Sequence, residues 1–88
     1  MYIILVYDIV KPKRSAKVLK FLRQHLIWVQ NSVFEGEVSE SRFAIIKSAV
    51  KNLIDEEKDS IIYYVFDSQN YLKRAVIGVD KNTLDTII

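Results

Sequence analysis

The sequence predicts an α+β domain in which two helices cover one face of an antiparallel sheet. Two observations indicate this class. Segments rich in β-branched and aromatic residues alternate with segments whose apolar residues recur at helical spacing, and polar or turn-forming residues separate them. Because the 88 residues include only two glycines and one proline, the chain offers no linker, and we expect a single domain over residues 1–88.

The first two predicted elements are an apolar strand and a basic amphipathic helix. Residues 1–7 form a short, unbroken apolar run, which is typical of a buried strand. Pro12 suits the first turn of a helix, which we expect to extend to about His25. In this helix the apolar positions fall on one face and the lysines on the opposite face. The apolar positions are Val18, Phe21, Leu22 and Leu26.

The middle of the chain has the composition of β-strands and contains one bend, for which the sequence offers two positions. Residues 28–38 predict two short strands or one bent ribbon, with Asn31-Ser32 or Glu35-Gly36 as the bend. Both pairs contain residues that turns favour, so the pattern leaves the two alternatives open.

The second half of the chain repeats the alternation of helix and strand. Ser39 suits an N-cap, and the helix after it runs to about Asp55. Residues 61–66 form another apolar strand, and residues 74–79 predict a last strand before a tail. This order is the ferredoxin-like βαββαβ plan with an extra C-terminal strand. One face of such a sheet has no helices, and a second copy of the chain could cover it.

Composition excludes several kinds of site. The absence of cysteine rules out disulfides, a cysteine-ligated zinc and a thiol nucleophile. No apolar run approaches the roughly 18 residues of a membrane span, so we expect a cytoplasmic protein with no membrane partner. Charge is uneven along the chain: residues 1–27 hold six lysines and arginines against one acid, and we expect this third to contact a polyanion.

Asp8 is the first charged residue and directly follows the first predicted strand. Mg²⁺ prefers oxygen ligands and accepts one or two carboxylates, with water and substrate phosphate in the remaining positions. One Asp8 is a weak site, but two brought together by a two-fold axis could hold a metal that activates water against a phosphodiester. The alternative is a strand-end acid that accepts hydrogen bonds from loop amides.

Basic residues follow Asp8 and predict a phosphate-binding surface. Positive side chains at a helix N-terminus are unfavourable for the helix dipole unless the site binds an anion. The alternative is an ordinary solvated face. The predicted nucleic-acid-binding residues are Lys11, Lys13, Arg14, Lys17 and Lys20.

The aromatic residues of the strands have two possible uses. They could stack on unpaired bases, or they could pack in the core or in an interface, which is the commoner use of strand aromatics. These residues are Tyr7, Trp28, Phe34, Tyr63 and Tyr64.

Several of these segments together resemble the CRISPR-associated family two proteins (Cas-two). They are Tyr7-Asp8-Ile9 at the end of the first strand, the basic helix, the stretch Trp28-Val29-Gln30-Asn31-Ser32-Val33-Phe34-Glu35-Gly36, and residues 59–64. The resemblance covers nearly the whole chain. It implies a homodimer whose sheets face each other, with C-terminal strands that complete the partner's sheet. The tail over residues 80–88 is expected to be extended or exchanged with the partner.

The resemblance also implies roles for individual residues. Asp8 of both subunits would share one Mg²⁺ or Mn²⁺ and act as the catalytic residue, with Tyr7 and Phe34 as its neighbours. The implied activity is endonucleolytic, on single-stranded RNA or double-stranded DNA, and the implied partner is the CRISPR integrase during spacer acquisition. The chain departs from members that carry arginines in the first helix and before the Val-Gln pair, where this sequence has Ser15, Lys17 and Trp28.

Three functions therefore compete. The first is a metal-dependent nuclease that requires Asp8. The second is a non-catalytic, dimeric DNA-binding scaffold that bridges integrase dimers, and the departures in the helix favour binding over cleavage, because lysine lacks the bidentate fork of arginine. The third is an unrelated ferredoxin-like ligand-binding module.

Overall fold

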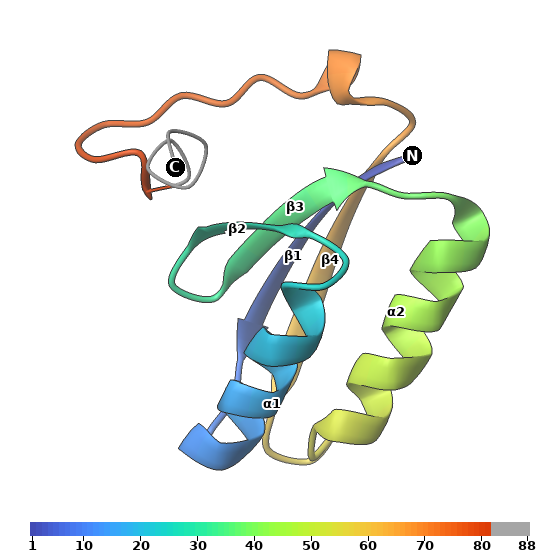
Figure 1. Ribbon diagram of the computed structural model, residues 1–88, viewed down its shortest axis with the longest axis vertical. Helices are drawn as coiled ribbons and strands as arrows, with labels where there is room; N and C mark the ends of the chain where they lie inside the picture. Colours follow the sequence, from blue (N-terminus) through green and yellow to red (C-terminus); the bar gives the residue numbers. More distant parts are fainter. Residues whose placement is uncertain (82–88) are drawn as a thin grey trace.

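The computed structural model describes residues 1–81. Within them, two helices lie on one face of a four-stranded antiparallel sheet (Figure 1). The strand order is β2-β3-β1-β4, so the first strand is central and pairs with β3 and β4. The predicted ferredoxin-like α+β fold is confirmed. The elements are β1 (Tyr2–Asp8), α1 (Pro12–Leu22), β2 (Ile27–Gln30), β3 (Val33–Glu37), α2 (Glu40–Leu53), β4 (Ser60–Phe66) and the short 3₁₀ helix η1 (Gln69–Tyr71).

The core lies between the sheet and the two helices. Strand β1 points alternate side chains toward the helices, and Ile3 and Leu5 are completely buried there. Phe34 of β3 and Ile46 of α2 are equally buried and belong to the same cluster. Within residues 1–81, this packing leaves the opposite face of the sheet, called here the open face, without a helix (Figure 1).

The bend in the middle of the chain falls at Asn31-Ser32. Gln30 pairs with Val33 across a two-residue turn, and Asn31 has a φ of 38°, a left-handed conformation that asparagine tolerates. Glu35-Gly36, the other candidate, lies inside β3.

Both helices begin where the sequence predicts and end slightly earlier. The first ends at Leu22 rather than at His25, and the second at Leu53 rather than at Asp55. The hydroxyl of Ser39 accepts a hydrogen bond from the amide of Arg42, which confirms the predicted N-cap.

The buried carboxylate of Asp59 links the start of α1 to the start of β4 through hydrogen bonds. The side chain of Asp59 has no exposed surface and accepts hydrogen bonds from Nε and Nη2 of Arg14 at 2.8 and 3.1 Å. It also accepts hydrogen bonds from the backbone amides of Val10 and Asp55, each 2.9 Å long. The Arg14 hydrogen bond is the main cause that holds the pKa of Asp59 well below its usual range, and the two amides add to it.

The predicted last strand over residues 74–79 is wrong for this chain, because residues 72–80 form no strand. A strand requires a hydrogen-bonding partner along its edge, whereas this segment crosses the open face and is held there by the side chain of Arg74. Gly78 turns the segment with a φ of 100°. Of the tail predicted over residues 80–88, residues 82–88 lie outside the described residues.

We predict that core packing on α2 dominates stability. Truncation of Ile46, which is 0% exposed, to alanine should lower the free energy of unfolding by about 2–5 kcal/mol, because it leaves a cavity. The adjacent Ile45 is 54% exposed, and Ile45→Ala is the matched control, expected within about 0.5 kcal/mol of the parent. Urea unfolding at one protein concentration measures both, and equal losses would contradict the described core.

We also predict that the Asp59 cluster makes stability depend on acid. Because the pKa of Asp59 is lower in the folded chain than in the unfolded one, its contribution is complete above the unfolded value of about 4. It is lost as the pH falls from about 5 toward the folded pKa.

Urea unfolding at a series of pH values between about 6 and 2 measures this loss. Asp59→Asn should be less stable at neutral pH, because Arg14 loses its charged partner, and its stability should fall less steeply in acid. The exposed Asp67 provides the control substitution Asp67→Asn, which should keep the parent slope. Parallel curves for the parent and Asp59→Asn would rule out this cluster as the acid-sensitive element.

Candidate functional site

Asp8 lies exposed at the end of β1, on the open face. Ile3, Leu5 and Tyr7 point toward the helices, so strand alternation directs the side chain of Asp8 to the other side. Ser60, the first residue of β4, is its cross-strand partner. Within residues 1–81 no hydrogen bond or ion pair engages the Asp8 carboxylate, so the loop-amide alternative is not what this structure shows.

The loop directly after Asp8 is fixed by the Asp59 cluster. The amide of Val10, two residues beyond Asp8, donates to Asp59. Arg14, on the first turn of α1, binds the same carboxylate. The position of Asp8 is thus set by the strand pairing of β1 and by the hydrogen bonds that hold the following loop to the buried Asp59 carboxylate.

An exposed apolar surface extends along the open face from Asp8. Ile62 and Tyr64 of β4 are 47% and 52% exposed, although both side chains are large and apolar. They pair with Val6 and Ile4 of β1, which are only partly covered. Neighbouring apolar residues exposed on a sheet face are typical of an interaction surface.

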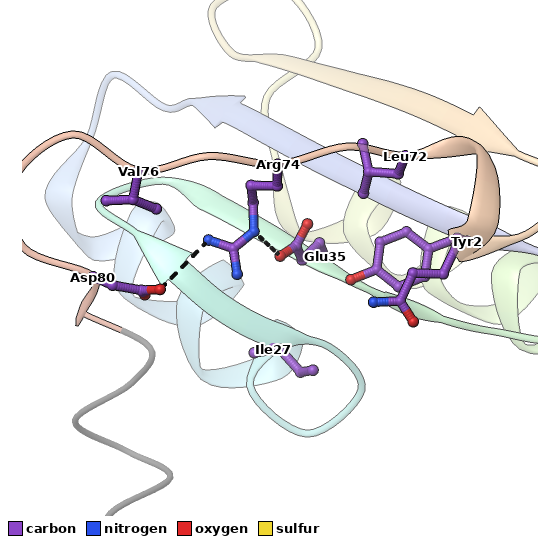
Figure 2. Close-up of a pocket in the computed structure, with 8 residues that line it drawn as sticks. Tyr2, Ile27, Glu35, Leu72, Arg74, Val76 and Asp80 are labelled. Atoms are coloured by element: carbon purple, nitrogen blue, oxygen red, sulfur yellow. Dashed lines mark ion pairs between the residues drawn. The ribbon is translucent and has the colours of Figure 1, made fainter.

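The chain's own C-terminal segment covers the remainder of the open face, over β3 and β2. Figure 2 shows Arg74 reaching down to Glu35, and the pair is 3.0 Å apart. Tyr2 and Leu72 line the same hollow, and burial is the main cause that raises the pKa of the Tyr2 hydroxyl. Glu35 is only 4% exposed, so its carboxylate is buried beneath this segment.

The predicted phosphate-binding residues separate into two groups. Lys11, Lys13, Lys17 and Lys20 are exposed on α1 and form what we call the lysine face. The first turn of α1 contains no acid, so its free amides and the lysines present uncompensated positive charge there. Arg14 does not belong to this surface in the described structure, because both of its hydrogen-bonding nitrogens bind Asp59.

The structure places the two predicted aromatic neighbours of the site in the core. Tyr7 and Phe34 stack with ring centroids 6.3 Å apart on the helix side of the sheet. Tyr7 is 6% exposed and Phe34 is fully buried, so both rings support the strand from behind Asp8. Burial also raises the pKa of the Tyr7 hydroxyl. Sequence could not show this, because an aromatic strand residue fits a core and a cleft equally well.

Asp8 by itself does not make a metal site. Within the described residues no three acidic or histidine side chains converge as metal ligands. Asp8 nevertheless has the chemistry that a hard divalent cation requires, an exposed carboxylate with free oxygen lone pairs. A second copy of Asp8 across the open face would complete a two-carboxylate set, which fits Mg²⁺ or Mn²⁺ with water and phosphate as the other ligands.

No helix in the described part of the chain is long and apolar enough to cross a membrane.

Comparisons with known proteins agree with this architecture. The family model described as CRISPR associated protein Cas2 matches residues 1–74. The chain is 53% identical to the CRISPR-associated endoribonuclease Cas2 of Thermococcus kodakarensis, over the full length of both chains.

Two solved structures are similar to the fold. A crystal structure of Cas2 superposes with a TM-score of 0.83 at 40% identity, covering 92% of this chain and 90% of the other. The crystal structure of Streptococcus pyogenes Cas2 at pH 6.5 gives a TM-score of 0.73 at 32% identity, covering 86% of this chain and all of the other. With these identities, and with a family model that spans most of its length, the chain belongs to the CRISPR-associated protein Cas2 family.

Proposed function

We propose that this protein is a metal-dependent endonuclease that acts as a homodimer in the cytoplasm, with Asp8 of both subunits holding one Mg²⁺ or Mn²⁺. The observation that supports this most is the position of Asp8: an exposed, unengaged carboxylate at the end of an uncovered apolar sheet face. If that face packs against a second copy, the two-fold axis brings the two carboxylates together. The curated relatives carry the name endoribonuclease, which supports RNA as the substrate.

Each part of the chain has a distinct task in this proposal. The divalent ion, when bound, supplies Lewis-acid stabilisation of the phosphoryl oxygen and lowers the pKa of a bound water. The paired Asp8 carboxylates hold and orient it, and Tyr7 and Phe34 pack behind the strand that carries them. The lysine face binds the backbone of the polyanion without reading its sequence, because phosphate contacts carry no sequence information.

A second function has its own supporting observation. Arg14 is engaged with Asp59, and the cations that remain on the outer face of α1 up to residue 20 are lysines. Lysine binds phosphate as a point charge and suits backbone binding better than precise alignment for cleavage. We therefore retain, as the alternative, a non-catalytic dimeric scaffold that binds duplex DNA and bridges CRISPR integrase dimers during spacer acquisition.

We predict that Asp8→Ala abolishes metal-dependent cleavage while the fold and the dimer persist. Loss of the Asp8 carboxylates of both subunits should lower the cleavage rate about 100-fold or more. Chelation of divalent ions should have the same effect on the parent protein, and addition of Mg²⁺ should restore its activity but not that of Asp8→Ala. Cleavage of a labelled single-stranded RNA measures both effects.

Asp67→Ala is the matched control, because Asp67 is also exposed but follows the opposite end of β4. It should cleave as the parent does. Full activity in Asp8→Ala would contradict the nuclease proposal. Spacer acquisition that persists in an inactive Asp8→Ala protein would assign the biological role to the scaffold instead.

We predict that nucleic-acid binding weakens as salt rises, because each phosphate contact releases counterions. In a plot of log affinity against log salt, Lys13→Gln with Lys17→Gln should reduce the slope by roughly 1.4 to 1.8, at about 0.7 to 0.9 per lost contact. The exposed Lys58, in the loop before β4, serves as the control site for Lys58→Gln. Fluorescence anisotropy measures the slope, and a slope unchanged by the double substitution would remove the lysine face from the binding surface.

A further inference from the structure

We propose that a hollow beside Trp28 binds one unpaired nucleobase of a single-stranded nucleic acid. This inference rests on the proposed nucleic-acid binding but concerns a place distinct from Asp8. The hollow has a volume of about 500 Å³ and lies between α1, the β2–β3 turn and the end of the described chain. It is lined by Leu19, Arg23, Trp28, Asn31 and Lys81.

The indole ring of Trp28 is held as a fixed platform. Its Nε1 donates a hydrogen bond of 3.0 Å to the backbone carbonyl of Asn31, which satisfies the only polar group of the ring. The side chain is half-buried and packs against the hydrophobic core. A ring with its polar edge satisfied offers its face for stacking, and stacking on an aromatic face tolerates any base.

The spacing above the ring is close to what one planar layer needs. The ammonium of Lys81 lies 6.0 Å from the centroid of the Trp28 ring. A stacked base needs roughly 3.5–4.0 Å on each of its faces, about 7–8 Å in all, so an outward movement of about 1–2 Å by the flexible Lys81 side chain would place its charge against the far face of the base. The base would then lie between the indole ring of Trp28 and the ammonium group of Lys81.

The charge around the hollow selects a polyanion. Of the five residues that line it, two are cations and none is acidic. Arg23 stands three residues from Lys20, so the two are neighbours on the surface of α1 and connect the hollow to the lysine face. A strand whose phosphates follow the lysine face can therefore place a base over Trp28.

The hollow lies on the helix side of the sheet, away from Asp8. Trp28 pairs with Phe34 of β3, whose side chain points into the helix-side core, whereas Asp8 projects from the open face. A base held here fixes the path of the strand over the protein and takes no part in bond cleavage. The hollow thus provides a preference for single strands over duplexes, in which bases are already stacked and paired.

The fluorescence of the protein offers a direct test, because Trp28 is its only tryptophan. We expect titration with a short oligouridylate, in the absence of divalent ions, to quench this fluorescence. The same backbone with abasic residues should bind through the lysine face but quench little. Equal quenching by the abasic strand, or binding of the oligouridylate without quenching, would overturn the proposal.

Substitutions provide the second test. Trp28→Leu keeps an apolar side chain against the core but removes the aromatic face, and it should weaken binding of oligouridylate by about 5- to 150-fold. Trp28→Phe should recover part of that loss, because it restores a ring. Tyr71 is 74% exposed and lies in η1, so Tyr71→Leu is the matched control and should bind as the parent does.

The abasic strand and a blunt duplex separate binding through an unpaired base from binding through the phosphate backbone. Trp28→Leu should leave affinity for both unchanged, which also shows that the variant is folded; an equal loss on all ligands would contradict a base site. Failure here is separable from failure of the proposed function. Metal-dependent cleavage lost only in Asp8→Ala supports the nuclease whatever Trp28 does, and a protein that binds no nucleic acid overturns both.

Discussion

The pairing register of β1 is the constraint on which the rest of the structure depends. This strand is central and hydrogen-bonded on both sides, so its alternation decides what faces the helices and what faces outward. Ile3 and Leu5 complete the core, while Asp8 projects from the open face. A slip of one residue would exchange the two sets and direct the carboxylate into the core, where an unpaired charge is costly.

The buried Asp59 carboxylate connects stability to the candidate site. It joins the first turn of α1, the loop before β4 and the loop after Asp8 through Arg14, Asp55 and Val10. A buried carboxylate without these donors would be destabilising, so the cluster depends on all of them. The same interaction engages the guanidinium of Arg14, whose side chain is 23% exposed. One ion pair therefore orders the backbone beside Asp8 and leaves lysines as the exposed cations of α1.

The two faces of the sheet present different chemistry. The open face carries Asp8 and exposed apolar residues, and the Arg74–Glu35 pair holds the chain's own C-terminal segment over the rest of it. The helix side carries the lysine face and the hollow beside Trp28. If a second copy of the chain covers the exposed apolar residues of the open face, the lysine face and the hollow stay accessible to nucleic acid.

Sequence alone determined the order of elements up to β4, the core stripes, the Ser39 cap and the strand-end position of Asp8, because these follow from local periodicity and capping chemistry. It also showed the family resemblance. Only the tertiary structure decided the pairing of Arg14 with Asp59, the burial of Glu35 beneath Arg74 and the absence of a strand over residues 74–79. These features depend on partners that are distant in sequence: 45 positions separate Arg14 from Asp59. Local pattern carries no information about which distant charges meet, or about which edge a strand finds.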